Sequence, residues 1–339
     1  MVKIEPRSVP CFVEVTNLIN ASPYRARASR PSALRRSHPA SERRGISLTI
    51  CLSAAMFLNE KNEVRSGWKF AIYLVFFLIF WVATGLTLSI FIYRSDSIAD
   101  SQLGLLALNE IALFVPAVVA MALTIRFVDH RPLRTFGIGL IPGWRRHLVS
   151  GTLLAVGMLA VLVAGSKVLG TLNIRWTGSN APGSTLLATF AVLLLAALNE
   201  ELVFRGFPLQ ILIDGLGEWP GMIAMSALFG AMHLSNPNSS ALGTLNTIIA
   251  GILLSLAYVR TRSLWMSYGL HIGWNLGLGF VLGFALSGID IASLWTTGVK
   301  GNATILGGNY GPEGGLLATF IFTASAVIVH RTSGRYSAD

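Results

Sequence analysis

The sequence predicts an all-α fold, a polytopic membrane bundle of about eight transmembrane helices. Hydrophobic residues make up 53% of the 339 residues and charged residues only 12%, whereas soluble domains carry about 25% charged residues. The apolar residues come in long runs, and a helix needs roughly 20 such residues to cross the hydrocarbon layer. The charged residues concentrate in the short connections between these runs.

Eight apolar runs follow one another, and each is expected to form a helix. The fifth and eighth runs are short for a span, so their boundaries are the least defined. No internal repeat is visible, which argues against a transporter built from two related halves. The runs cover residues 68–93, 103–126, 148–170, 185–212, 220–235, 242–259, 264–287 and 315–330.

Residues 1–55 have a different composition from the rest of the chain. They are rich in Arg, Ser, Pro and Ala and offer little to bury, so they are expected to be disordered. Residues 1–46 hold nine Lys/Arg and three Asp/Glu, which is six of the net charge of +10. An Arg- and Ser-rich segment fits a transit peptide. We favour a second interpretation, in which translation starts at Met56 and the transmembrane domain covers residues 56–339.

Basic residues in the connections predict the orientation of the bundle. The connection after the second run holds five arginines, from Arg126 to Arg146, and the turn after the sixth holds Arg260 and Arg262. With eight spans, these connections and both termini lie on one side, which the positive-inside rule assigns to the cytoplasm. We therefore expect an integral protein of the plasma or inner membrane. Membrane orientation accounts for the positive charge, so no nucleic-acid partner is expected.

The fourth run places three charges inside an apolar helix, in the stretch "LLLAALNEELVFRGFPLQIL". A charged group inside a span costs about 2.5–3.5 kcal/mol on insertion scales. Glu201 and Arg205 are four residues apart, so they share one helical face and can pair. Glu200 points about 100° away from Glu201 around the helix. Glu200 has no partner within its own helix, which makes it the candidate functional carboxylate.

Two other runs carry polar groups that could meet Glu200. His233 lies in the fifth run, and the seventh run has His271 and Asn275 four residues apart on one face. With a helical rise of about 1.5 Å per residue, these groups and Glu200 lie about 10–20 Å from the cytoplasmic ends of their helices. They are therefore expected to line one internal cavity that water can enter.

Three motifs in this order resemble those of the CPBP family of intramembrane proteases. "EELVFR" fits Glu-Glu-x-x-x-Arg, "FGAMH" fits Phe-x-x-x-His, and "HIGWN" fits His-x-x-x-Asn. The family includes type II CAAX prenyl endopeptidases and bacteriocin-processing or immunity relatives. The resemblance covers roughly residues 185–280, the motif core of the transmembrane domain, and residues 1–55 have no counterpart in it.

The resemblance implies an intramembrane endopeptidase in which Glu200 activates a water molecule. His233 would hold that water or the substrate, and His271 and Asn275 would stabilise the oxyanion. Glu201 and Arg205 would be supporting residues. The substrate would be a membrane-associated protein or peptide, either CAAX-type and prenylated or a leader-type peptide. The alternative is a non-catalytic membrane interaction or immunity protein of the same family.

The sequence leaves the metal dependence open. His233 and His271, together with Glu200, match the residue types of a catalytic zinc set. The chain lacks His-Glu-x-x-His, and the i+4 partner of His271 is an asparagine, a poor zinc ligand. A zinc enzyme and a metal-free glutamate mechanism are both compatible with these residues. The oligomeric state is not predicted.

Three further polar or flexible features are expected to have structural roles. Asn109 and Glu110 could reach the same cavity, but interhelical hydrogen bonds are the favoured expectation for them. Asn246 is expected to bridge helices. The glycine-rich stretch 298–315 is expected to be a flexible outer loop.

Overall fold

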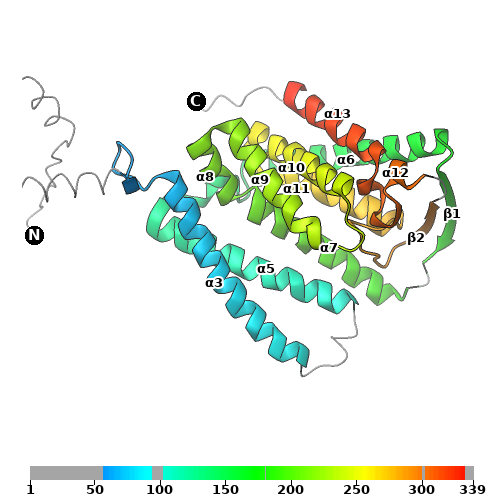
Figure 1. Ribbon diagram of the computed structural model, residues 1–339, viewed down its shortest axis with the longest axis horizontal. Coiled ribbons are helices and arrows are strands. Elements are labelled where there is room, and N and C mark those ends of the chain that lie inside the picture. The colour runs from blue at the N-terminus through cyan, green and yellow to red at the C-terminus, as the bar shows by residue number, and fades with distance from the viewer. Residues whose placement is uncertain (1–55, 94–101, 180, 300–301, 333–339) are drawn as a thin grey trace, which may run out of the picture. The chain divides into compact units, whose positions relative to one another are not determined.

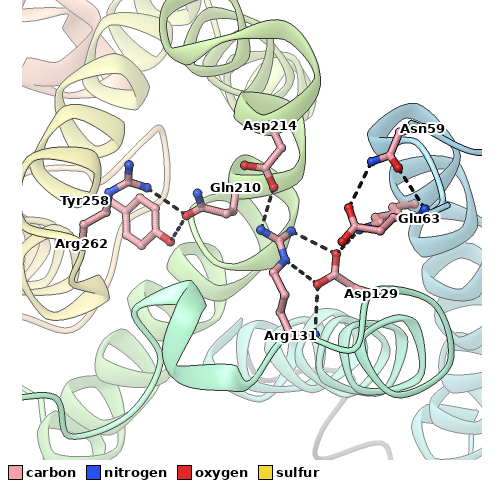
Figure 2. Close-up of polar contacts among 9 residues, drawn as sticks. Asn59, Glu63, Asp129, Arg131, Gln210, Asp214, Tyr258 and Arg262 are labelled. Carbon is pink, nitrogen blue, oxygen red and sulfur yellow. Dashed lines mark hydrogen bonds and ion pairs between the residues drawn. The ribbon is translucent and has the colours of Figure 1, made fainter. Parts of the chain in front are cut away.

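A computed structural model describes residues 56–93, 102–179, 181–299 and 302–332, and it confirms the all-α class. The predicted disorder of residues 1–55 lies outside the described residues. The chain divides into two units, Met1–Val64 and Arg65–Asp339. In the described part of the first unit, the side-chain oxygen of Asn59 accepts hydrogen bonds from the backbone amides of Lys61 and Glu63. These bonds close a tight turn (Figure 2).

The second unit is a bundle of helices, and every predicted apolar run coincides with at least one of them (Figure 1). The helices are α3 (Ser66–Tyr93), α5 (Gln102–Thr124), α6 (Trp144–Val168), α7 (Gly183–Phe204), α8 (Phe207–Leu216), α9 (Glu218–Met232), α10 (Ala241–Thr261), α11 (Leu264–Asn275) and α13 (Leu316–Thr332). A π-helical segment, Ile125–Asp129, extends α5, and a second, Leu276–Val281, extends α11.

The predicted number of about eight spans is not confirmed. Five helical segments in the described chain are long and apolar enough to cross a membrane, and these make the chain an integral membrane protein. The helices α9, α11 and α13 are shorter, with 15, 12 and 17 residues. The fourth apolar run contains two helices, because the chain turns at Gly206 between α7 and α8. A side chain at Gly206 would place its Cβ 2.7 Å from the carbonyl oxygen of Leu202.

Close contact between α6 and α11 fixes the centre of the bundle. A Cβ at Gly269 would lie 2.2 Å from the carbonyl oxygen of Leu148, and one at Gly151 would lie 2.3 Å from that of Met266. The hydroxyl of Thr152 donates a hydrogen bond to the carbonyl of Gly269 across the same interface, at 3.1 Å. Small residues allow such close approach of helices in membranes. Helix α11 also packs against α7 and α10.

Helices α3 and α5 form a hairpin side by side, which also contacts α8 and α7 (Figure 1). Tyr73 and Phe207 pack against each other where α3 meets α8, with ring centroids 5.7 Å apart. Most of α3 remains exposed in the protein, including Leu86 at 65% and Ile79 at 57%. Exposed apolar residues at this density are expected of a helix that faces lipid.

Short strands, a short helix and 3₁₀ turns follow α6 and the π-helical segment that extends α11. The strands β1 (Leu172–Gly178) and β2 (Trp295–Val299) form an antiparallel ribbon. The prediction that the glycine-rich stretch is a flexible outer loop is wrong for its described residues 302–315. They form α12 (Ala303–Leu306) and two 3₁₀ turns, and they bury Leu306 and Tyr310. The glycines are needed for close backbone approach, since a Cβ at Gly311 would lie 2.1 Å from the carbonyl oxygen of Ala285.

Charged and polar side chains in and beside two of the basic connections join several helices (Figure 2). Asp129 pairs with Lys69 of α3 at 2.8 Å and with Arg131 at 2.6 Å. Arg131 also contacts Asp214 of α8 at 2.8 Å. The amide oxygen of Gln210 on α8 accepts hydrogen bonds from Tyr258 and Arg262 at the end of α10. These contacts place the starts or ends of α3, α5, α8 and α10 on one side.

Reporter fusions test the predicted orientation of this basic end. A cytoplasmic reporter fused after Arg262, and one fused after Asp339, should both be active, because lysines and arginines favour the cytoplasmic side. A reporter that is active only outside the cytoplasm should be inactive at both sites. A periplasmic or lumenal signal at either site would contradict the predicted orientation.

Candidate active site

The four predicted catalytic side chains line one cavity inside the second unit. The cavity has a volume of about 720 Å³. Its walls are mostly apolar and include aromatic residues of α3. Its polar lining comes from α5, α7, α10 and α11, from the 3₁₀ turn after α9, from the loop after the π-helical segment Leu276–Val281, and from the glycine-rich segment. The four predicted residues that line it are Glu200, His233, His271 and Asn275.

Glu200 is the carboxylate that α7 presents to the cavity. Its side chain is 25% exposed, whereas the side chain of Glu201 is completely buried. This difference follows from the helix, since consecutive side chains point about 100° apart. One residue therefore faces the cavity while the next faces the protein interior. The distinction between the two glutamates that the sequence predicts is present in the structure.

Glu201 forms a buried group with Arg205 and His271. The predicted pair is confirmed, because Arg205 Nη1 lies 3.2 Å from Glu201 Oε1. The same oxygen lies 2.8 Å from His271 Nδ1. A carboxylate oxygen only accepts hydrogen bonds, so Nδ1 of His271 is the donor. The hydrogen bond from His271 thus holds α11 to α7, while Arg205 compensates the buried charge of Glu201.

This hydrogen bond sets the direction of the His271 ring. With Nδ1 bound to Glu201, Nε2 lies on the other side of the ring, 3.9 Å from Glu200 Oε2. Asn275 follows one helical turn later on α11, is 9% exposed and also lines the cavity. The i,i+4 spacing therefore brings an imidazole nitrogen and an amide to the same cavity as Glu200.

His233 begins the 3₁₀ turn that follows α9. Its Nδ1 donates a hydrogen bond to the carbonyl of Phe229, at 2.8 Å. This leaves Nε2 available on the cavity side of the ring. Phe229 packs against His233 with ring centroids 4.6 Å apart and ring planes tilted by 58°. The guanidinium of Arg205 lies 4.2 Å from the centroid of the Phe229 ring. The phenylalanine of the second motif therefore packs between the buried arginine and the histidine.

Two acidic residues of the cavity were not assigned to the site from the sequence. Glu110 of α5 lines the cavity and is 7% exposed. Its Oε2 accepts a hydrogen bond from Asn199 of α7 at 2.9 Å, so the expected interhelical bond is present. Asn199 could have been found from the sequence, because it directly precedes Glu200 in an apolar run.

Glu313 is the second unpredicted acidic residue. It accepts hydrogen bonds from the Trp274 indole at 2.8 Å and from the backbone amide and hydroxyl of Ser287, at 2.7 and 2.8 Å. Trp274 directly precedes Asn275, so Glu313 fixes this end of α11. Nothing in the glycine-rich stretch indicated that its glutamate would reach the cavity. Asn246 of α10 donates to the carbonyls of Glu313 and Gly315, which confirms that it bridges helices.

The candidate zinc ligands are only partly arranged for a metal. His233 and His271 both engage Nδ1 and leave Nε2 free, and a carboxylate on the second nitrogen is typical of metal-binding histidines. Among the described residues, however, no group of three His, Cys, Asp or Glu side chains is close enough to hold a metal ion. His233, His271 and Glu200 thus do not fit a zinc set as they stand. We derive no step of the reaction through a metal.

Comparison with known proteins agrees with the predicted resemblance. Residues 182–277 match the family described as "Type II CAAX prenyl endopeptidase Rce1-like", which confirms the resemblance drawn from the three motifs. The chain is also 29% identical over 137 residues to an Escherichia coli protein described as "Uncharacterized 24.3 kDa protein". This similarity involves 37% of the chain and covers 62% of the length of that relative. All six predicted site residues lie within the matched range.

Replacing Arg205 tests whether its role is structural. Removing one partner of a buried ion pair costs about 3–5 kcal/mol, because the remaining charge stays buried. Arg205→Ala should therefore lower the folded yield and the Tm of the protein purified in detergent. The control is Arg146→Ala, since Arg146 is exposed and should tolerate the change. Normal yield and Tm with lost activity would instead assign Arg205 a direct role in catalysis.

Proposed function

We propose that this chain is an intramembrane endopeptidase that hydrolyses a peptide bond in a membrane-associated substrate. The observation that supports it most is that the motif residues, which come from separate segments of the chain, meet in one cavity of about 720 Å³ within the bundle. A scaffold would gain nothing from polar groups placed there, because buried polar groups in a membrane carry a cost.

In the proposed reaction, Glu200 is the general base. It takes a proton from a water molecule while the water oxygen attacks the carbonyl carbon of the scissile bond. The free Nε2 of His233 orients this water or the substrate. When the tetrahedral intermediate collapses, the C–N bond breaks and Glu200 returns the proton to the leaving amine. Glu200 thus takes up one proton and releases one proton in each cycle, and it is again a carboxylate when the products leave.

His271 and Asn275 would stabilise the oxyanion of the intermediate. A carboxylate on Nδ1 stabilises positive charge on an imidazole ring, as in the serine protease triad. Glu201 is placed to do this for His271, so Nε2 can carry a proton and donate it as a hydrogen bond. The Asn275 amide offers a second donor from the next turn. Donors fixed before the reaction act strongly in a site from which most water is excluded.

The cavity walls indicate the class of substrate. Apolar and aromatic side chains of α3 and α5 form one wall, and α3 is largely exposed on its outer side. Such a wall suits a peptide that carries or lies next to a lipid-like group. We propose a CAAX-type prenylated protein or a leader-type peptide as the substrate. The enzyme would lie in the plasma or inner membrane with both termini in the cytoplasm.

Glu200→Gln is the decisive variant for this proposal. Glutamine keeps the size of the side chain and loses the ability to take a proton, so turnover should fall by about 10²–10⁴-fold. The protein should insert and fold like the wild type. The measurement is cleavage of a fluorogenic peptide in reconstituted liposomes, with one farnesylated CAAX-type and one leader-type peptide.

Glu218→Gln is the matched control. Glu218 is a glutamate at the start of α9 that pairs with Arg260 outside the cavity. Its amide variant should keep wild-type turnover. If neither peptide is cleaved, comparison of the membrane proteomes of cells with wild-type and Glu200→Gln protein should reveal the substrate. A well-folded Glu200→Gln protein that cleaves at the wild-type rate would refute the proposed mechanism.

Chelation tests the metal dependence. Among the described residues, no three His, Cys, Asp or Glu side chains lie close enough together to hold a metal ion. We therefore expect 1,10-phenanthroline to leave cleavage unchanged, and metal analysis of the purified protein to find less than stoichiometric zinc. Loss of activity with chelator, followed by recovery on addition of Zn²⁺, would show a zinc enzyme. In that case His233 and His271 would be the first ligands to replace.

A further inference from the structure

The two residues that flank Glu200 in the chain are each bonded to a different helix. On one side, Asn199 is 1% exposed and its Nδ2 donates to Glu110 Oε2 of α5 at 2.9 Å. On the other side, Glu201 is fully buried and accepts from His271 of α11 at 2.8 Å. Glu200 itself is the one of the three that faces the cavity.

Helical geometry gives these two bonds a common effect. Successive residues are about 100° apart around the axis, so the side chains of residues 199 and 201 lie on either side of Glu200. A hydrogen bond from residue 199 or from residue 201 alone would restrain the rotation of α7 about its axis less well. Bonds to α5 and α11 together fix both its rotation and its depth. The direction in which Glu200 projects is then determined by its neighbours.

Glu110 is a costly choice for a purely structural hydrogen bond. Carboxyl groups inside a span are rare and usually functional. Its position in the same cavity as Glu200, and its bond to the preceding residue, connect it to the reaction centre. Neither the motifs nor the matched range 182–277 includes residue 110.

We propose that Glu110 is a positioning residue that acts on Glu200 through Asn199. The inference rests on the proposed role of Glu200 as the general base. Glu110 does not touch the substrate in this scheme. It holds the start of the Glu-Glu-x-x-x-Arg motif against α5, so that Glu200 stays aimed at the scissile bond. The helical hairpin of α3 and α5 then contributes to catalysis as well as to the cavity wall.

Two substitutions at residue 110 separate positioning from other roles. Glu110→Gln keeps a side-chain acceptor oxygen for Asn199. Glu110→Met keeps the length and removes this acceptor, so that only the backbone carbonyl of residue 110, 3.4 Å from Asn199 Nδ2, remains. We expect Glu110→Met to lower kcat by about 10²-fold with KM little changed, as misplacement of a catalytic group does. Glu110→Gln should retain most of the wild-type kcat. Ile111→Met is the control, because Ile111 is 40% exposed and lies outside the cavity.

A labelling experiment tests the same idea without any protease activity. Cys11 and Cys51, the two cysteines of the sequence, are replaced by serine, and Glu200 is replaced by cysteine. The rate of modification by a small charged methanethiosulfonate then reports how far residue 200 faces the water-accessible cavity. The rate should fall when Glu110→Met is added, and it should not change with Glu110→Gln or Ile111→Met.

The outcomes distinguish the two proposals. Equal labelling rates in all backgrounds would overturn the positioning role, and so would a Glu110→Met enzyme with wild-type kcat. If Glu110→Gln loses as much kcat as Glu110→Met, the charge or proton of Glu110 matters and the positioning role is again wrong. A labelling difference in a protein that cleaves neither peptide, and for which the proteome comparison reveals no cleaved substrate, would support positioning while contradicting the proposed protease function.

Discussion

The buried carboxylate of Glu201 is the interaction on which the site depends. A fully buried charge in an apolar bundle persists only when other groups compensate it. Arg205 supplies the opposite charge from the end of α7, and His271 supplies a hydrogen bond from α11. Because one oxygen serves both partners, the position of the His271 ring follows from the same interaction that neutralises the arginine. Replacing Glu201, Arg205 or His271 by an apolar residue would remove a partner from at least one buried polar group.

Close helix packing supports this charged group. Gly151 and Gly269 let α6 and α11 approach until backbone atoms of one helix touch the other. Helix α11 is thus held on one side by this contact with α6 and on the other by the hydrogen bond from His271 to Glu201 of α7. Helices in a lipid environment associate mainly through packing and hydrogen bonds. Both kinds of interaction converge here on α11, which carries His271 and Asn275.

The cavity combines two environments that the proposed chemistry requires. Polar groups from α5, α7 and α11 gather on one part of its surface, while α3 and α5 provide an apolar wall. A base and hydrogen-bond donors act more strongly where bulk water is excluded. The glycine-rich segment completes the arrangement, since Glu313 ties Trp274 of α11 to Ser287. Asp129 and Arg131 form their ion pair where α5 ends and the first basic connection begins.

The sequence by itself determined the helical class, the apolar runs, the Glu201–Arg205 pair and four of the polar residues that line the cavity. These follow from local rules, because hydrophobic length and i,i+4 spacing depend on nearby residues alone. The tertiary structure decided what depends on distant residues. It showed that Gly206 divides the fourth run, that residues 302–315 pack on the bundle, and that Glu110 meets Asn199. The contact between Glu110 and Asn199 joins positions 89 residues apart, and no local pattern specifies which of many polar side chains will meet.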